Sequence, residues 1–201
     1  ALGCSDVEYN FPWGWSELEG IANRQNYDLT CHEKESGKDL KYFDEEKNES
    51  FIPFVIEPSA GVDRSVLAFL VDAYHEDEVD SAKGKTEART VLRFSNALAP
   101  IKCAVLPLSK KSPLFETADA IYKDLRKEFF CDFDERGSIG KRYRRFDEIG
   151  TPYCITVDFD TTGDDTKEGD NKVTIRHRDT LEQERVSIDQ LKNKMRELLY
   201  S

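Results

Sequence analysis

The strongest constraint on the fold is a change of hydrophobic period that recurs through the second half of the sequence. Residues 101–108, 153–159 and 173–178 are apolar or alternating runs of strand length. Between and after them, residues 114–129 and 188–199 repeat apolar side chains every three or four positions, which predicts amphipathic helices. Strand–helix alternation of this kind predicts an α/β fold in which helices cover a mixed or largely parallel sheet.

The first half follows a different pattern, with strands and one strong helix. Residues 51–56 form a short apolar run after a polar turn, and this predicts a hairpin arm that enters a buried strand. Apolar residues then recur at helical spacing, which predicts a helix over residues 62–76. We therefore expect two domains, residues 1–96 and 97–201.

The composition is compatible with this division, and the two halves differ in net charge. The 201 residues carry a formal net charge of -11. Residues 1–96 contain 20 acidic and 10 basic side chains, whereas residues 97–201 contain 20 and 19. The acidic total therefore does not exclude a nucleic-acid surface on the second half. The longest aliphatic or aromatic run, residues 66–71, is far shorter than the roughly 20 residues of a membrane span, so we expect no membrane association.

The cysteines and histidines indicate neither a disulfide framework nor a metal site. Five cysteines is an odd number, and no two have the Cys-x-x-Cys spacing of a zinc site. The three histidines also lack ligand spacing. Reduced thiols and a cytoplasmic location are expected, with no bound metal.

Residues 57–64 place several chemically useful groups around one predicted strand-to-helix junction. A strand period of two puts Glu57 and Ser59 on the same side of the chain, and Arg64 lies in the first turn of the following helix. A carboxylate with a hydroxyl can hold an ammonium group, and a guanidinium at a helix N-terminus can hold phosphate. The alternative is a strand end with a capping serine and a surface Glu–Arg pair.

An acidic strand is a second candidate. Simple alternation places Trp15, Glu17 and Glu19 on one face of it. Two acids at this spacing could hold a metal or a ribose, or could simply face water.

Two basic segments in the second half are a third candidate. Residues 136–145 carry five positive charges and no negative ones, with Tyr143 among them, and Arg176 and Arg178 share one face of a later strand. Bases with aromatic neighbours suit phosphate contact and base stacking. The alternative is a solvated helix whose charges pair with the acids beside it.

These segments occur in an order that resembles the C-terminal part of the homodimeric type of glycyl-tRNA synthetase, a class II aminoacyl-tRNA synthetase. The resemblance covers essentially the whole chain, and each single match is weaker than the ordered set. The matching segments are residues 14–24 (GWSELEGIANR), 27–29 (YDL), 55–64 (VIEPSAGVDR), 99–109 (APIKCAVLPLS), 137–145 (GSIGKRYRR), 147–152 (DEIGTP) and 175–180 (IRHRDT).

The resemblance implies roles for the first half, where residues 57–64 would be the third class II signature motif. Glycine would be held by Glu57, Pro58, Ser59, Ala60 and Gly61. ATP, with its accompanying Mg2+, would be lined by Glu17, Leu18, Gly61, Val62, Asp63 and Arg64, with Arg64 as the catalytic residue on the phosphates. The implied reaction forms glycyl-adenylate and pyrophosphate, and then transfers glycine to its tRNA.

For the second half, the resemblance implies an anticodon-binding domain of the class IIa type, a mixed sheet of about five strands with three helices. Residues 1–96 would be the C-terminal part of the catalytic domain. The basic residues expected to contact tRNA are Lys141, Arg142, Arg144, Arg145, Arg176 and Arg178.

The first two class II signature motifs have no counterpart in the sequence. We therefore expect the chain to be part of a longer protein, homodimeric when complete, and to be inactive alone. The alternative function is a non-catalytic nucleic-acid-binding protein built on the synthetase scaffold, although such a protein has no reason to keep Glu57, Ser59 and Arg64.

Overall fold

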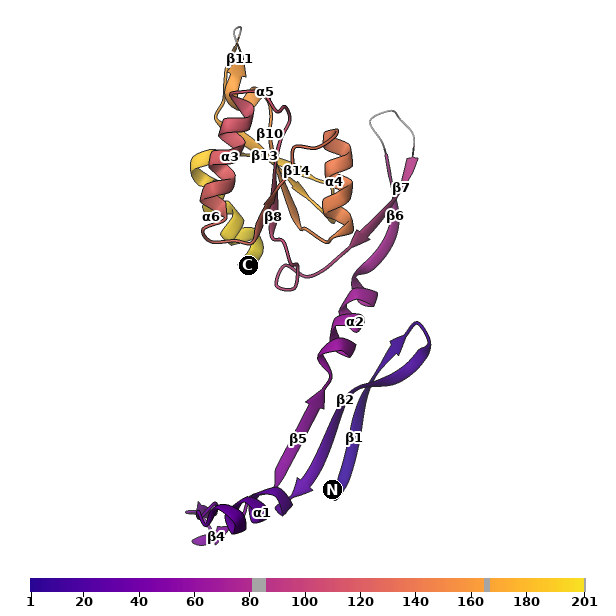
Figure 1. The fold of residues 1–201 in the computed structure, drawn as a ribbon, viewed down its shortest axis with the longest axis vertical. Coiled ribbons are helices and arrows are strands. Elements are labelled where there is room, and N and C mark those ends of the chain that lie inside the picture. The colour runs from indigo at the N-terminus through magenta and orange to yellow at the C-terminus, as the bar shows by residue number, and fades with distance from the viewer. Residues whose placement is uncertain (81–85, 165–166, 201) are drawn as a thin grey trace. The chain divides into compact units, whose positions relative to one another are not determined.

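The computed structural model describes residues 1–80, 86–164 and 167–200, which form two compact units, Ala1–Val71 and Asp72–Ser201 (Figure 1). The boundary expected from the sequence, between residues 96 and 97, lies later than this division of the contacts, and its position stays a prediction. Among the described residues, no helix has the length and hydropathy needed to cross a membrane.

The first unit is built on a three-stranded antiparallel sheet in the order β1-β2-β5. Its elements are β1 (Gly3–Phe11), β2 (Gly14–Gln25), α1 (Tyr27–Ser36), β3 (Tyr42–Asp44), β4 (Glu49–Phe51), β5 (Val55–Ala60) and the start of α2 (Val62–Ala73). The strands β3 and β4 form a separate two-stranded hairpin.

Three details of the expected first half are wrong. The apolar run 51–56 is split between β4 and β5, and Pro53 lies in the break because it has no N–H to donate to a strand ladder. The strand that follows is not buried, since Ile56 is 57% exposed. The helix ends at Ala73 rather than at residue 76, because the chain from Tyr74 onward pairs with another strand.

The second unit combines a hairpin with a five-stranded sheet. The hairpin consists of β6 (Tyr74–Asp80) and β7 (Thr86–Leu92). The remaining elements are β8 (Cys103–Pro107), α3 (Leu114–Leu125), β9 (Cys131–Phe133), α4 (Ile139–Glu148), β10 (Tyr153–Val157), α5 (Phe159–Thr162), β11 (Gly163–Asp164), β12 (Lys167–Glu168), β13 (Lys172–His177), β14 (Gln183–Ser187) and α6 (Ile188–Tyr200). The sheet order is β14-β13-β10-β8-β9. Strand β8 pairs in parallel with β9 and β10, whereas β13 pairs antiparallel with both β10 and β14. The expected mixed five-stranded sheet is confirmed.

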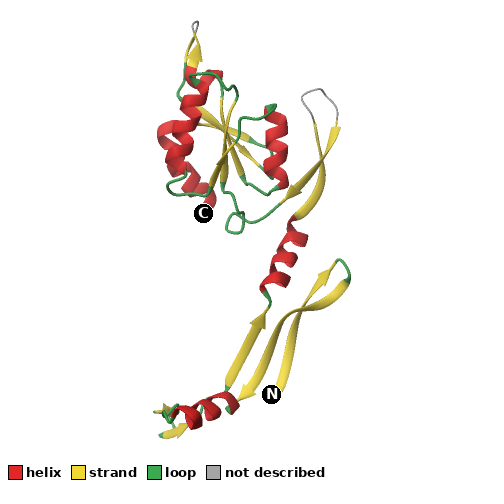
Figure 2. Cartoon of the chain, in the orientation of Figure 1, coloured by secondary structure: helices red, strands yellow, loops and turns green. Residues whose placement is uncertain are grey.

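The core of the second unit lies on both faces of this sheet. All residues of the central strands β8 and β10 are buried, as expected for parallel strands covered on both sides. Figure 1 shows α3 and α6 on one face and α4 on the other, and Figure 2 shows the same helices flanking the sheet. One face packs Val105 and Ile155 against Met195, whereas the other packs Leu106 against Phe146.

The strand predicted over residues 153–159 ends two residues early. Asp158 caps the next helix, α5, in a reciprocal capping box with Thr161, so the chain leaves the sheet after Val157.

Candidate functional site

Glu57 and Ser59 lie over a floor of small residues in the first unit. In the β2–β5 ladder Glu57 is opposite Ala22, and Ser59 is opposite Gly20. Residues directly opposite each other in an antiparallel pair project from the same face. The carboxylate and the hydroxyl therefore stand beside two positions whose side chains are absent or a single methyl, which leaves room for a small ligand.

A β-bulge in the middle of β2 brings Glu17 to this face. The register passes from Val7–Glu19 directly to Glu8–Glu17, which leaves Leu18 as an extra residue. The extra residue reverses the alternation, so Glu17 lies on the face of Gly20. A Cβ added at Gly20 would lie 3.3 Å from Glu17 Oε1. The expected common face for Glu17 and Glu19 is therefore wrong.

Arg64 occupies the edge of β2 that β5 leaves open. The β2–β5 pairing ends at Ala60, opposite Glu19, so the preceding part of β2 has no strand on that side. The Arg64 guanidinium donates to Ser16 Oγ at 3.3 Å and to the carbonyl oxygen of Glu17, and its Cζ lies 5.9 Å from the centroid of the Phe11 ring. The side chain remains exposed, so it can still meet an anion. The structure thus brings Arg64 and Glu17 together.

The surface ion pair of Glu57 is made with Arg24 rather than with Arg64. Arg24 Nη1 lies 3.4 Å from Glu57 Oε2, and Arg24 also donates to Asp28 at 2.6 and 2.7 Å. The hydrogen bond from Arg24 lowers the pKa of Asp28. Arg24 therefore holds Asp28 more tightly than Glu57, whose side chain is 49% exposed.

Apart from Leu18, the other residues expected to line this site are exposed and lie on β5 or directly after it. Pro58 and Ala60 are opposite Ile21 and Glu19 in the ladder, so they project from the face opposite Glu57 and Ser59. The remaining three connect β5 to the first turn of α2 and are Gly61, Val62 and Asp63.

In the second unit, three of the arginines expected at a tRNA interface are buried and internally bonded. Arg142, Arg176 and Arg178 are 2%, 6% and 3% exposed. Arg176 donates to both carboxylate oxygens of Asp147, at 2.8 and 2.9 Å, and its guanidinium lies 4.7 Å from the centroid of the Tyr143 ring.

The other two buried arginines bind main-chain carbonyl oxygens. Arg142 donates to the carbonyl oxygens of Pro107 and Asp134, at 2.7 and 3.0 Å. Arg178 donates to those of Gly150 and Phe94, each at 2.8 Å. These guanidinium groups fasten loops and strands together.

The three remaining basic residues of the set lie on α4 and are more accessible. Lys141 is exposed, and Arg144 is 27% exposed with Glu87 3.8 Å away. Arg145 is 45% exposed and pairs with Asp134. Burial works to raise the pKa of Asp134, but the hydrogen bonds from Arg145 and from the main-chain N–H of Arg136, together with the charges of both arginines, lower the pKa overall.

The carboxyl ends of the parallel strands gather further groups that the sequence patterns did not single out. Strand β8 is followed in sequence by β9 on one side and then by β10 on its other side, which makes the β8–β10 border a topological switch point. Lys110 follows β8 and lies 3.3 Å from Glu135, which follows β9. Arg136, the residue after Glu135, has a side chain that is 88% exposed. Phe159, which follows β10 at the same edge, is 55% exposed. The strand–helix alternation in the sequence could have pointed to this edge, because Lys110 follows one predicted strand and Phe159 ends another.

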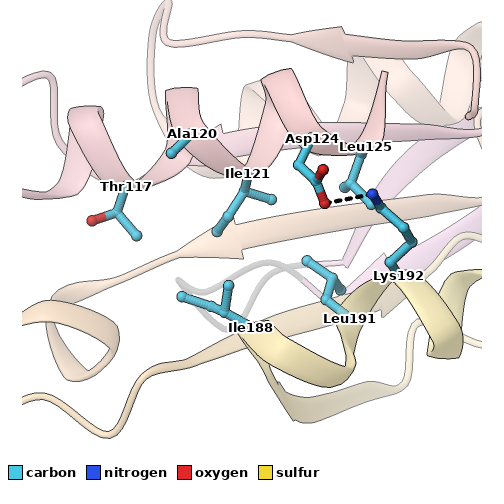
Figure 3. A pocket seen from close by; sticks show the side chains of 8 residues that line it. All are labelled: Thr117, Ala120, Ile121, Asp124, Leu125, Ile188, Leu191 and Lys192. Carbon is cyan, nitrogen blue, oxygen red and sulfur yellow. Dashed lines mark ion pairs between the residues drawn. The ribbon is translucent and has the colours of Figure 1, made fainter. Parts of the chain in front are cut away.

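A groove of about 300 Å3 between α3 and α6 has a different character (Figure 3). Its walls are largely aliphatic, and its lysine, Lys192, is 2.6 Å from Asp124. It contains none of the site residues expected from the sequence, and its largely aliphatic lining makes it a poor binding site for a phosphate backbone.

Comparison with known proteins supports the resemblance. Residues 102–198 match the family described as "Anticodon binding domain". A curated relative from Thermobifida fusca named "Glycine--tRNA ligase" is 55% identical over 197 residues, which is 96% of this chain and 41% of that protein. One of the same name from Clostridium kluyveri is 58% identical over 193 residues, again 96% of this chain and 39% of that protein. The chain thus spans about two fifths of the length of the curated relatives it matches.

A solved structure shares the fold at lower identity. The crystal structure of the RNA binding domain of threonyl-tRNA synthetase from Cryptosporidium parvum Iowa II aligns with a TM-score of 0.66 and 20% identity, over 98% of this chain and 42% of that chain. The expected resemblance to the C-terminal portion of glycyl-tRNA synthetases is confirmed, as is the α/β fold class.

Proposed function

We propose that this chain is the C-terminal part of a glycine–tRNA ligase, which supplies one wall of the glycine and ATP pocket and the anticodon-binding domain. The observation that carries the proposal is the 55–58% identity to glycine–tRNA ligases over 96% of the chain. Such identity extends through both units, so it supports a shared reaction as well as shared RNA binding.

Glycine is assigned to the face of β2 and β5 that carries Glu57 and Ser59. The carboxylate and hydroxyl bind the ammonium group, and the Gly20–Ala22 floor makes room for the ligand beside them. Pro58 and Ala60 stiffen the strand from its other face, and Gly61 lets the chain turn closely around the ligand. Selection of glycine then depends mainly on the space denied to a larger side chain.

ATP is assigned to the neighbouring edge of β2. Arg64, already held at this edge by Ser16 and Glu17, meets the phosphates, while Leu18, Val62 and Asp63 line the nucleotide. A glycine carboxylate oxygen attacks the α-phosphorus, and the bond to the bridging oxygen breaks with release of pyrophosphate. The fixed guanidinium offsets the negative charge that develops on the phosphates. Mg2+ would enter with the ATP.

The anticodon stem-loop is assigned to the carboxyl ends of β8, β9 and β10. Lys110, Arg136, Lys141 and Arg144 are accessible cations there or on α4 beside it, and Phe159 offers an exposed ring for base stacking. No acidic residue lies in the first turn of α4, which suits that helix end to a phosphate.

Arg142, Arg176 and Arg178 have a supporting role in this proposal. Their guanidinium groups are already bonded to Asp147 and to main-chain carbonyl oxygens, so they hold the β10–β13 region in shape. Arg145 contributes partly to support through Asp134 and partly as an accessible charge.

The test uses the longer protein that contains this chain. Replacing Arg64 with alanine should lower glycine-dependent exchange of pyrophosphate into ATP by about 100-fold or more, the usual effect of removing one preorganised charge-stabilising donor. Lys47→Ala, at the exposed β3–β4 turn, is the matched loss of a cation and should leave the rate unchanged. Equal rates for Arg64→Ala and wild type would remove Arg64 from the reaction, and the absence of glycine-dependent exchange in the wild-type protein would favour the non-catalytic binding protein.

A further inference from the structure

Two of the five cysteines face each other across neighbouring parallel strands of the second unit. Cys103 begins β8 and Cys131 begins β9, and the two residues are partners in the register. Their Sγ atoms lie 3.0 Å apart. Neighbouring strands run about 4.8 Å apart, which falls within the roughly 4.4–6.8 Å that a disulfide spans between Cα atoms. The backbone therefore needs no large movement for a covalent bond to form.

We propose that Cys103 and Cys131 are a modification site, at which a hydroperoxide drives formation of a reversible disulfide across β8 and β9.

The two thiols have different surroundings, which assigns them different roles. Cys131 is half-buried, whereas Cys103 has no exposed surface. The hydrogen bond from the Cys103 thiol, helped less strongly by the charge of Arg126, lowers the pKa of Cys131. The same contact, together with burial, raises the pKa of Cys103. Cys131 is therefore the thiolate that meets the oxidant, and Cys103 is the thiol that resolves the product.

The chemistry balances in two steps. The Cys131 thiolate attacks one peroxide oxygen, the O–O bond breaks, and the other oxygen leaves as hydroxide or alkoxide to give a sulfenic acid at Cys131. The Cys103 sulfur then attacks the Cys131 sulfur, the S–O bond breaks, and the departing hydroxide takes the Cys103 proton as water. The two sulfurs together lose two electrons, which the peroxide receives. A dithiol reverses the change.

The other cysteines lack this arrangement. Cys154 is opposite Ala104, not Cys103, and belongs to the cluster on the other face of the sheet. Burial raises the pKa of Cys154 to about 12, which keeps it protonated. Cys4 and Cys31 lie in the first unit, and neither contacts another sulfur in the described part of the chain. These three thiols serve as internal comparisons.

The experiment treats the full 201-residue chain with hydrogen peroxide near neutral pH, blocks the remaining thiols by alkylation, and maps peptides by mass spectrometry without reduction. We expect one linked pair of peptides, joining Cys103 to Cys131, whose mass is lower by two hydrogens and which separates again in dithiothreitol. Recovery of both cysteines in alkylated form while Cys4 is oxidised would overturn the proposal.

Variants separate the two roles. Cys131→Ser should abolish the link, and Cys103→Ser should leave a sulfenic acid at residue 131 that dimedone traps. Cys154→Ser should form the link at the wild-type rate. Arg126→Gln keeps both sulfurs and the buried core, and should slow the link several-fold, so the test does not depend on a variant of the core. Unchanged linkage in Cys131→Ser, or an unchanged rate in Arg126→Gln, would contradict the assigned roles.

Discussion

Asp147 has no exposed surface and is bound by two arginines from different elements. Arg176 on β13 donates to both of its oxygens, and Arg89 on the β6–β7 hairpin lies 3.4 Å away. Arg89 also donates to the carbonyl oxygen of Arg178 at 2.7 Å and to Asp77. Asp147 is thus the counter-charge of Arg176 and shares Arg89 with Asp77, and it ties the hairpin to the sheet.

We expect Asp147→Ala to lower the free energy of unfolding by about 3–5 kcal/mol, because it leaves the buried guanidinium group of Arg176 without its counter-charge. Urea unfolding followed by circular dichroism measures this. Asp119→Ala removes a partly exposed carboxylate paired with Lys123 and should change stability by only about 0.5 kcal/mol or less. Equal small losses for both variants would show that the buried pair is dispensable.

At the scale of elements, helix α4 presents two kinds of basic residue. Arg142 points inward to the carbonyl oxygens of Pro107 and Asp134, whereas Lys141 and Arg144 remain accessible. A helix turn of 3.6 residues places adjacent basic residues on different faces, so one segment can both anchor the helix and offer charge. Of the two interpretations made from the sequence, pairing with neighbouring acids describes Arg145, which pairs with Asp134, whereas contact of Lys141 and Arg144 with tRNA stays a prediction. The buried Arg142 fits neither interpretation.

The double variant Lys141→Ala/Arg144→Ala should weaken binding to glycine tRNA and flatten its salt dependence. Each lost phosphate contact removes about 0.7–0.9 from the slope of log affinity against log salt. Lys123→Ala/Lys127→Ala removes the same charge from the end of α3 and the turn after it, and should leave the slope unchanged. Binding measured over a series of salt concentrations decides this, and an unchanged slope in the α4 variant would remove these residues from the interface.

The strand–helix alternation of the second half predicted the sheet of the second unit. Parallel strands that are buried on both faces have continuous apolar sequences, and such runs can be recognised without the structure. The position of Glu17 could not be predicted, since the bulge at Leu18 arises from pairing with β1, which local alternation does not contain. The burial of Arg142 and Arg176 could not be predicted from the sequence either. A basic residue that closes a buried ion pair and one that faces solvent are the same letter in the sequence, and only packing distinguishes them.

At the scale of the whole molecule, the two units divide the proposed reaction between them. The unit Ala1–Val71 carries the groups assigned to glycine and ATP, all on or beside one face and edge of β2. The unit Asp72–Ser201 carries the surface assigned to tRNA. The acidic excess falls on the half expected to hold the small substrates, which leaves the half that would meet RNA nearly neutral.

We expect the 201-residue chain on its own to bind glycine tRNA but to form no glycyl-adenylate, because the proposed function gives it only one wall of the glycine and ATP pocket. Filter binding with glycine tRNA, and pyrophosphate exchange with and without glycine, measure the two activities separately. Glycine-dependent exchange by the chain alone would contradict the division, and so would an affinity no higher than that for an unrelated tRNA of equal length.

The bulge at Leu18 makes the orientation of Glu17 depend on the pairing of β2 with β1. With plain alternation through residues 17–20, Glu17 would project from the same face as Glu19, on the far side of the sheet from Ser59. Leu18 is the surplus residue that interrupts this alternation, so Glu17 stands opposite Glu8 and lies on the face of Ser59. Deletion of Leu18 would remove the bulge and keep Glu17 on that face, whereas a change that flattens the bulge without removing a residue would turn the carboxylate away. The orientation of this carboxylate is therefore a property of backbone register rather than of the side chain at position 18.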